Sequence, residues 1–398
     1  MPRSSRPEPA SLLIAAVSGR ALAHSAFRAG LQPLVADFFT DADTQSLAYA
    51  CRKLDDLPRG FGWASLRRAL EALVEAAPSP VLGLAYGAGF EDRPTLLAKI
   101  AERWPLLGND AATVARVKAP DSFFAALDRL HIPHPKTATA RPARGEDWLT
   151  KSRGGAGGSH IVPSRLGKDG PDVYYQERVA GRAVSALFVA DGARARVLGF
   201  SEQWAAPSPR SLWRYGGAVR PARLAAGTEE RMVITVERVA RAFAIKGLAS
   251  ADFMVNEGLA LLLEINPRPG ATLDIFDSDS KSLLRLHLDA VMERKLPRAG
   301  LKFEDARASA IVYAPKGVAV PCGMIWPDWA ADRPKPSERI DKNRPICTVL
   351  ARAQTKARAK RLVEARIAKV LANFLSLSRG DTGAQKSRRE RNASNGVA

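Results

Sequence analysis

A strand-like stretch in the middle of the chain carries three polar side chains at alternate positions. They are Glu264, Asn266 and Arg268, and an apolar run precedes them. Side chains of a strand alternate between its two faces, so these three can point the same way. Carboxylate and amide oxygens suit Mg²⁺, which takes few protein ligands and completes its octahedron with phosphate oxygens and water. The guanidinium adds a fixed positive fork for a phosphate or a carboxylate.

A second carboxylate lies on another short apolar run, with Asp252 twelve positions before Glu264. The turn residues 256–258 between the two runs predict a hairpin that brings Asp252 opposite Glu264. The alternative is a surface hairpin with ordinary charges, but charges between Leu261–Leu263 and a Pro-Arg-Pro segment are not typical of a solvated face. We therefore predict a Mg²⁺ site made of Asp252, Glu264 and Asn266, with Mn²⁺ as an alternative metal.

A lysine at the end of an apolar strand is followed at once by a glycine loop. The strand ends at Lys151, and residues 154–158 contain four glycines. Glycines let backbone N–H groups turn inward around phosphate oxygens, and a lysine supplies a point charge to the same oxygens. The order and spacing exclude a GxxxxGK[ST] loop. A plain linker remains the alternative.

The composition predicts a packed protein of several domains. The chain has 398 residues, of which 46% are hydrophobic and 25% charged. No apolar run reaches the roughly 18–20 residues that a membrane span needs, and the apolar N-terminal stretch is expected to be an internal strand rather than a secretion signal. The three cysteines, Cys51, Cys322 and Cys347, form no CxxC pair, so neither a disulfide framework nor a zinc site is implied. We expect a cytoplasmic protein.

The net charge of +19 is concentrated at the C-terminus. Residues 351–398 hold 12 Lys and Arg against 3 acids. Their net charge of 12 − 3 = +9 is close to half of the total net charge. Residues 351–373, with Arg352 on the basic side, predict a basic amphipathic helix, and residues 374–398 a disordered basic tail. A solvated helix face and a floppy tail are the favoured interpretation, and weak contact with RNA or anionic surfaces is the alternative.

Strands and helices alternate in the first part of the chain. We expect strands over 11–17, 32–36 and 81–86 with helices over 21–30 and 66–77, which is typical of a parallel sheet with crossover helices. Ligands bind at the C-terminal strand ends of such sheets. Candidate lining residues there are Ser18, Gly19, Arg20, Asp37 and 87–91, including Glu91. No GxGxxG motif supports a dinucleotide site.

Further elements are expected along the rest of the chain. They are helices over 110–117, 122–130 and 228–245, a hairpin of strands 184–189 and 196–200, a loop over 201–221, and strands over 308–313, 318–320 and 346–350. The last three strands predict a small β-rich cap.

Taken in order, these pieces resemble the ATP-grasp superfamily of ligases over roughly residues 1–300. The resemblance implies an α/β protein with an N-terminal Rossmann-like domain of parallel strands (1–109) and a two-lobed α+β ATP-grasp domain (110–300). A small C-terminal β-rich region with the basic helix (301–373) and the tail would follow. The segments Gly19-Arg20, 86–91 and 264–276 are similar to uncharacterised predicted ATP-dependent carboligases related to biotin carboxylase. Such proteins are often found in bacteria with methanopterin-linked C1 metabolism, which points to cofactor biosynthesis.

The resemblance also implies roles for single residues. ATP would be bound by Lys118, Lys151, Gly154, Gly155, Gly157, Gly158, Ser159, His160, Gln176, Glu177 and Val179. Asp252, Glu264 and Asn266 would hold Mg²⁺. Lys151 and Arg268 would be catalytic, and the substrate would meet Gly19, Arg20, Glu91, Tyr215 and Arg268. Two departures concern the nucleotide: Gln176 stands where many members have Glu, and Ala183 stands where some have a ribose-binding Glu.

The implied activity is ligation. With ATP and Mg²⁺, a small-molecule carboxylate would become an acyl phosphate, which an amine, a thiol or a similar nucleophile then attacks. A carboxylase or kinase-like enzyme on the same site is one alternative, and a non-catalytic nucleotide-binding protein with a nucleic-acid-attracting tail is another. Substrates, ATP and a second copy of the chain in a homodimer are the expected partners.

Overall fold

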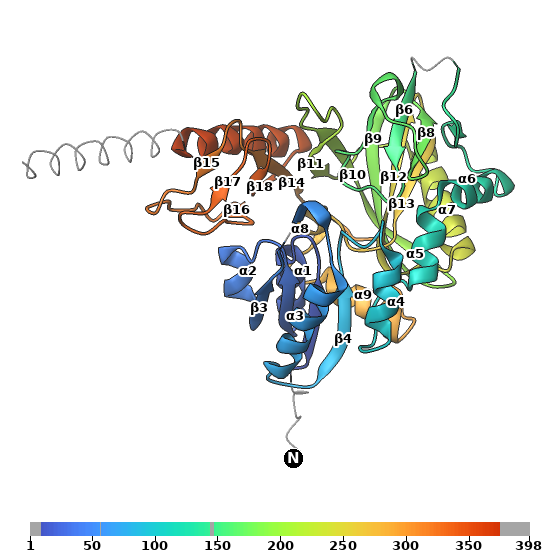
Figure 1. The fold of residues 1–398 in the computed structure, drawn as a ribbon. Coiled ribbons are helices and arrows are strands. Elements are labelled where there is room, and N and C mark those ends of the chain that lie inside the picture. Colours follow the sequence, from blue (N-terminus) through green and yellow to red (C-terminus); the bar gives the residue numbers. More distant parts are fainter. Residues whose placement is uncertain (1–8, 56, 144–146, 375–398) are drawn as a thin grey trace, which may run out of the picture.

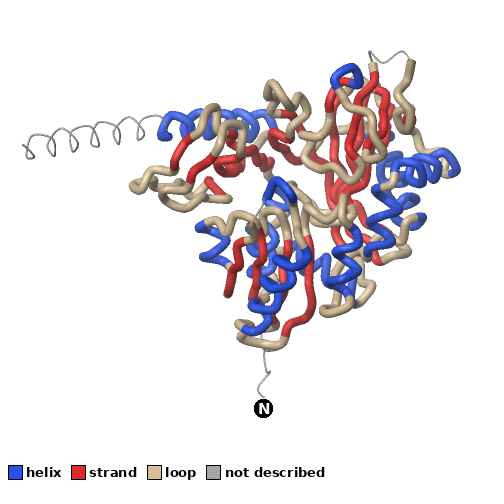
Figure 2. The backbone as a smooth tube through the Cα atoms, viewed as in Figure 1, coloured by secondary structure: helices blue, strands red, loops and turns tan. Residues whose placement is uncertain are grey.

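The computed structural model describes residues 9–55, 57–143 and 147–374. An N-terminal domain carries a two-lobed body and, beside it, a C-terminal part that ends in a long helix (Figure 1). Figure 2 shows that strands run through all of these parts, while most helices lie on the outside of the sheets.

The N-terminal domain is a four-stranded parallel sheet in the order β3-β2-β1-β4. Its strands are β1 (Ser11–Ala15), β2 (Gln32–Asp37), β3 (Ala50–Lys53) and β4 (Val81–Tyr86), and its helices are α1 (Arg20–Arg28), α2 (Ala42–Leu47), α3 (Trp63–Glu75) and α4 (Pro94–Ala101). Three of the strands and two of the helices confirm the expected alternation. The fully buried run of β1 explains why it is central, because strands covered on both faces read as continuous apolar segments.

An eight-stranded sheet forms the centre of the molecule, in the order β13-β12-β9-β10-β11-β14-β18-β16. Its strands are β9 (Arg182–Asp191), β10 (Ala195–Ala205), β11 (Tyr215–Arg220), β12 (Lys246–Asn256), β13 (Leu259–Asn266), β14 (Ala306–Tyr313), β16 (Ala330–Ala331) and β18 (Pro345–Ala353). One face packs on α7 (Ala226–Ala242), and the other packs on α8 (Leu273–Phe276), α9 (Leu283–Met292) and α1. The sheet therefore joins the N-terminal domain to the rest of the chain.

The loop expected over 201–221 is wrong, because this segment contains the end of β10 and all of β11. Glycines at 216 and 217 suggest a loop, but in the structure they serve close packing. A Cβ on Gly217 would lie 2.4 Å from the carbonyl oxygen of Ser309 and 2.5 Å from the Trp204 ring. Only glycine lets β11 pair with β14 beneath that indole.

A second lobe covers the end of the central sheet that carries β12 and β13 (Figure 1). It holds a small sheet in the order β5-β8-β6-β7, with β5 (Thr137–Ala138), β6 (Trp148–Ser152), β7 (Val162–Pro163) and β8 (Val173–Glu177). The helices α5 (Ala111–Lys118) and α6 (Pro120–Arg129) lead into it. This lobe and the hairpin of β12 and β13 enclose the candidate site.

Residues 301–374 extend the central sheet rather than forming a separate one, because β14 pairs with both β11 and β18. A two-stranded ribbon of β15 (Val318–Ala319) and β17 (Arg339–Ile340) lies beside them. Residues 356–374 are helical and bury Val363, Val370 and Phe374. Two expectations are corrected here: Arg352 lies on β18, and Phe374 belongs to the helix.

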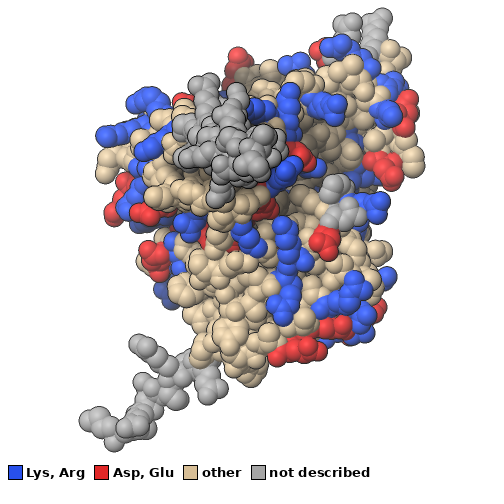
Figure 3. Space-filling model, turned by 60° about the vertical axis from the view of Figure 1, so that its left-hand side comes forward, with Lys and Arg blue, Asp and Glu red and all other residues tan. Residues whose placement is uncertain are grey.

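Basic side chains crowd the C-terminal part of the molecule in Figure 3. The expected disordered tail, apart from Phe374, lies outside the described residues. Among the described residues, no helix combines the length and apolarity needed to cross a bilayer.

His287 on α9 is fully enclosed between the two main sheets. Its Nδ1 accepts the N–H of Leu248 at 2.9 Å, and its Nε2 donates to the carbonyl of Leu107 at 2.8 Å. This pairing requires a neutral ring with the proton on Nε2. Burial accordingly lowers the pKa of His287 to about 4.

The position of His287 predicts an acid-sensitive core. The unfolded ring titrates near 6.5, so the native state binds fewer protons, and this contribution to stability is present above pH 6.5 and is lost towards pH 4. The loss should reach about 3 kcal/mol. Urea unfolding at pH 7 and pH 4.5 should show a smaller pH effect for His287→Gln than for the wild type. The exposed His131, changed to Asn, should leave the wild-type pH effect intact, and equal pH effects in all three proteins would contradict the assignment.

Candidate active site

The predicted hairpin is formed by β12 and β13, and its register places Asp252 directly opposite Glu264. Two residue pairs further along, and so on the same face, Asn266 is opposite Ser250. The Asn266 amide donates to Asp252 at 3.0 Å, which ties the three side chains together. The hairpin prediction is therefore confirmed.

A lysine at the end of α5 reaches the same group of side chains. Nζ of Lys118 lies 3.2 Å from a Glu264 oxygen and 2.9 Å from the Asn266 amide oxygen. Burial alone would raise the pKa of Glu264, but Lys118, Lys151 and His160 hold it below its ordinary range. Glu264, whose side chain is 35% exposed, is therefore ionised.

Asp252 is compensated less fully, because Ser185, Lys118 and Arg268 oppose only part of the effect of burial and of Glu264. Burial, followed by the charge of Glu264, raises its pKa. Its Oδ1 is buried and has no hydrogen-bond partner among the described residues. A divalent cation would satisfy both needs, because it neutralises two adjacent carboxylates and takes a free oxygen as ligand. Two carboxylates and an amide oxygen thus fit Mg²⁺. The described residues hold no group of three or more His, Cys, Asp or Glu placed to bind a metal, so phosphate or water oxygens must complete the shell.

Lys151 lies on β6 and is buried in the second lobe. Its Nζ donates to Oε1 of Gln176 on β8 at 2.6 Å, and burial lowers its pKa. The Gln176 amide nitrogen is buried without a partner among the described residues. The Glu177 N–H donates to the Lys136 carbonyl at 2.8 Å. Val179 lines a hollow beside β12 and β13.

The glycine loop after β6 bridges two other parts of the chain. Gly154 packs on the backbone of Glu91 and Asp92, where a Cβ would lie 2.6 Å from a carbonyl oxygen. Gly157 accepts the N–H of Tyr215 at 2.9 Å. Gly155 lies under the His160 ring, Gly158 lies against the Trp213 carbonyl, and Ser159 is exposed. The loop therefore lies at the mouth of the site, between the N-terminal domain and β11.

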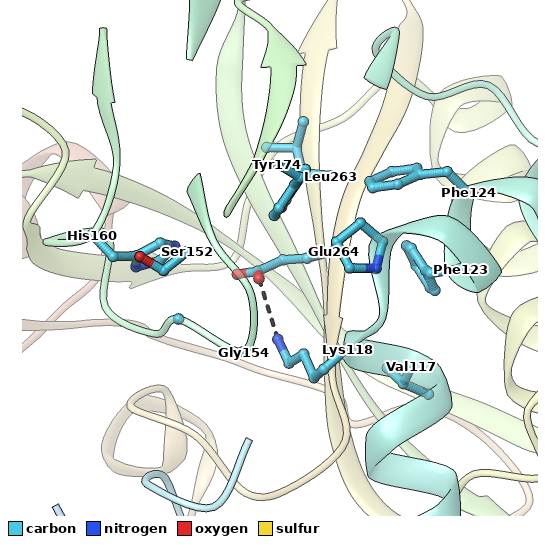
Figure 4. Close-up of a pocket in the computed structure, with 12 residues that line it drawn as sticks. Val117, Lys118, Phe123, Phe124, Ser152, Gly154, His160, Tyr174, Leu263 and Glu264 are labelled. Atoms are coloured by element: carbon cyan, nitrogen blue, oxygen red, sulfur yellow. Dashed lines mark hydrogen bonds and ion pairs between the residues drawn. The ribbon is translucent and has the colours of Figure 1, made fainter. Parts of the chain in front are cut away.

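A narrow cavity runs between the loop and the hairpin. Figure 4 shows Lys118 and Glu264 pointing towards each other, with His160 and Ser152 on one side and Phe123 and Phe124 on the other. The apolar wall was missed by sequence analysis and consists of Val117, Pro120, Phe123, Phe124, Tyr174 and Leu263. In the sequence, these residues look like ordinary core positions on a helix or a strand.

Arg268 reaches across to the N-terminal domain. Its Nε donates to Glu91 at 2.7 Å, and both side chains are at most 9% exposed. The other Glu91 oxygen accepts the N–H groups of Gly89 and Phe90. Burial by itself would raise the pKa of Glu91, but Arg268, Lys118 and these N–H groups lower it. Nη2 of Arg268 has no partner among the described residues, so it can still receive an anion.

Asn109 fastens the same junction and was also missed. It is buried, and its amide group bonds to both the N–H and the carbonyl of Lys246 and to the carbonyl of Pro267. Asparagine in a loop gives no sign of such a role.

The remaining predicted substrate residues divide into two groups. Glu91 and Arg268 form the pair described above, and Tyr215 lies on β11, beside the glycine loop. Gly19 supports packing, because a Cβ there would lie 2.4 Å from Val35. Arg20 is buried in a separate acidic cluster, where it contacts Asp274 and Asp332.

Comparison with known proteins identifies a family that matches part of this chain. Residues 122–272 match the family defined as the ATP-grasp domain. This chain carries an ATP-grasp domain. A stretch of 135 residues is also 27% identical to the carbamoyl phosphate synthase large chain of Thermoanaerobacter sp. (strain X514), and it covers 33% of this chain but only 12% of that one.

Solved structures with the same ATP-grasp fold cover nearly the whole chain. Biotin carboxylase of Campylobacter jejuni superposes with a TM-score of 0.67 at 14% identity, over 88% of each chain. L-amino acid ligase of Bacillus licheniformis gives 0.67 at 14% identity, over 90% of this chain and 97% of that one. N5-carboxyaminoimidazole synthetase of Staphylococcus aureus, complexed with ADP, gives 0.63 at 15%, over 90% and 97%. ATP-grasp enzymes thus include both ligases and carboxylases.

The Glu91–Arg268 pair predicts strong energetic coupling between the N-terminal domain and β13. Removing one partner of a buried pair leaves an uncompensated charge and typically costs about 3–5 kcal/mol. Glu91→Gln and Arg268→Met should each destabilise by that order in urea unfolding, and the double variant by clearly less than their sum. The exposed neighbour Asp92, changed to Asn, should change stability by only about 0.5 kcal/mol. Additive single effects would show that the pair is not coupled.

Proposed function

We propose that this chain is an ATP- and Mg²⁺-dependent ligase in cofactor biosynthesis. It activates a small-molecule carboxylate as an acyl phosphate, which an amine or a similar nucleophile then attacks. The observation that carries the proposal is the hairpin pair of Asp252 and Glu264, with an orphaned oxygen on Asp252 and two lysines whose charges act on Glu264.

The apolar wall and the cations assign the two ends of the nucleotide. Phe123, Phe124, Tyr174 and Leu263 offer flat or branched apolar surface for an adenine ring. Lys118, Lys151 and the glycine loop supply charge and N–H groups for the phosphates. The enclosed space is only about 30 Å³, enough for roughly two waters. A nucleotide therefore requires the lobe of β5 to β8 to move outward.

Asp252, Glu264 and Asn266 would hold Mg²⁺, which neutralises phosphate charge when bound. The chain's own part in the first step is positioning and charge compensation. Lys118 and Lys151 stabilise the charge that spreads over the phosphate oxygens as a substrate carboxylate oxygen bonds to the γ-phosphorus and the bond to ADP breaks. Arg268 orients that carboxylate through the N–H groups that Glu91 does not occupy.

The second step joins the acyl group to the nucleophile. The amine nitrogen bonds to the acyl carbon, the bond to phosphate breaks, and the amine loses a proton. The site must exclude water for this step, because water would hydrolyse the acyl phosphate. The closed contacts of Gly154 on Glu91 and of Gly157 on Tyr215 provide that barrier.

A carboxylase is the second candidate, favoured by the superpositions on biotin carboxylase and on N5-carboxyaminoimidazole synthetase. Bicarbonate would then be the carboxylate that is activated. The two activities separate in one assay. ADP release that requires bicarbonate supports the carboxylase, and release that requires an organic acid without bicarbonate supports the ligase.

Substitution of the charged groups tests the proposal directly. One lost electrostatic contact to a reacting centre typically costs about 10²–10³-fold in rate. Glu264→Gln and Lys151→Met should each lower ADP release by at least that factor, measured with Mg²⁺ against a panel of carboxylates and amines. The exposed Lys168, changed to Met, serves as the control and should keep the wild-type rate. Undiminished release by both site variants would sink the proposal.

Two glycines of the loop form a matched pair for a second test. Both Gly157 and Gly158 are left-handed, with φ of 69° and 72°, so alanine costs roughly 1–2 kcal/mol at either. Only Gly158 is also crowded, since its Cβ would lie 2.0 Å from the Trp213 carbonyl oxygen, while nothing lies within 4 Å at Gly157. Gly158→Ala should weaken MgADP binding by about tenfold more than Gly157→Ala in calorimetric titration. Equal losses would mean that the contact with Trp213 does not position the loop.

A further inference from the structure

A second concentration of charge lies beyond the C-terminal ends of β1 and β2. Five carboxylates from three distant parts of the chain meet there: Asp37, Asp41, Asp43, Asp274 and Asp332. We call them the acidic cluster. Figure 3 views the side on which the C-terminal part overhangs the N-terminal domain, and acidic atoms are visible in the shaded recess between the two.

Four of the five carboxylates have partners. Arg20 bonds to Asp274 at 2.7 Å and to Asp332 at 3.0 and 3.1 Å. Asp37 accepts the N–H groups of residues 19, 39 and 40. Asp43 accepts those of residues 332 and 333 at 2.8 and 2.9 Å. These four are therefore accounted for by the fold.

Asp41 is the exception. It stands at the N-cap of α2 but makes no capping bond, and its side chain has no hydrogen bond or ion pair with any described residue. The residue is only 5% exposed. Asp332, Asp37, Asp43 and Glu338 all act on it with like charge, and Lys335 is engaged with Thr40 instead. An unpaired carboxylate buried among four others is costly, so a missing cation is the simplest reason for its presence.

The backbone around Asp41 is held in an unusual conformation. Thr40, just before it, has φ of 45°, and Asp332, across from it, has φ of 53°. Such conformations cost of order 1–3 kcal/mol for residues other than glycine, and they cluster at binding sites.

The geometry selects the kind of cation. Among the described residues, these acids are not arranged as a set of three metal ligands. An ammonium group makes no such demand, because it donates single hydrogen bonds to separate acceptors. An organic amine therefore suits the acidic cluster better than a metal ion.

The cluster also adjoins the proposed reaction site. Burial raises the pKa of Tyr215, and the charges of Asp252 and Asp274 add to that effect. The chain geometry agrees, because the Val17 N–H donates to the Ala88 carbonyl and so joins the end of β1, beside the cluster, to the segment that follows β4 and carries Glu91.

We propose that Asp41 binds an ammonium group of the amine substrate other than the nitrogen that attacks the acyl carbon, within the acidic cluster closed by Asp332 and Asp43. The proposal rests on the function proposed above and names the substrate class as a cationic amine. Glu91 and Arg268 then serve the acid, and the cluster serves the amine, so the two substrates enter from different sides.

Binding should release a proton. Burial and the surrounding acids raise the pKa of Asp41 to about 8, so at pH 7 it is mostly protonated, and an ammonium ion favours its ionised form. The charged groups that face it are Asp37, Asp43, Asp332 and Glu338, with Arg20, Lys335 and Arg333 around them. The four acids outnumber the three basic residues, so the net charge around Asp41 is negative and attracts a cation.

The test uses the full chain without nucleotide. Saturation-transfer NMR and calorimetry measure binding of n-butylammonium and of its neutral isostere n-butanol to the wild type, to Asp41→Asn and to the exposed control Asp55→Asn. We expect the ammonium probe to bind to the wild type and to the control with proton release, at least tenfold weaker binding to Asp41→Asn, and no preference for the alcohol. Asp41→Asn should melt no lower than the wild type, since it removes repulsion.

Three results would overturn the inference: equal binding to the wild type and Asp41→Asn, displacement of the probe by Mg²⁺ alone, or a clear loss of stability in Asp41→Asn. A failure of the amine site can be distinguished from a failure of the proposed ligase function. If ADP release stays dependent on Lys151 while Asp41→Asn binds amine normally, only the amine site is wrong. If no carboxylate supports ADP release but the probe still depends on Asp41, only the ligase assignment is wrong.

Discussion

The pairing of two carboxylates across one hairpin is the constraint on which the rest of this structure depends. Asp252 and Glu264 face each other in register, and both are half-buried. Two like charges in that position repel. Lys118 and Lys151 compensate Glu264 fully, whereas Ser185, Lys118 and Arg268 compensate Asp252 only in part. The negative charge that remains favours a bound cation. The cavity, the glycine loop and the apolar wall lie around this pair of carboxylates.

A buried pair of opposite charges joins two parts of the chain at the candidate site. Glu91 belongs to the N-terminal domain and Arg268 to the end of β13, so their contact joins the two parts at the site itself. Asn109 reinforces the same junction. The N-terminal domain and β13 are thus joined at the candidate site itself.

Local patterns predicted the elements and the hairpin, because alternation on β13 and the turn at residues 256–258 are encoded over short stretches. The strand β11 was missed because Gly216 and Gly217 look like a loop, and their packing under Trp204 depends on distant strands. Likewise, Phe123 and Phe124 look like core residues, and Asp41 like a helix cap. Arg20 remains a predicted substrate residue, but its partners Asp274 and Asp332 are more than 250 positions away and could not be predicted from local patterns. Contacts of that kind follow from tertiary packing, which periodicity does not reveal.

The central claim is that the hairpin binds a divalent metal together with a nucleotide. Electron paramagnetic resonance of Mn²⁺, titrated into the full chain with and without ADP, measures this directly. The account predicts tight Mn²⁺ binding only when ADP is present, with coupling of the metal to phosphorus nuclei, and loss of that signal in Asp252→Asn and Glu264→Gln. Mn²⁺ binding that is indifferent to ADP, or that survives both substitutions, would contradict it.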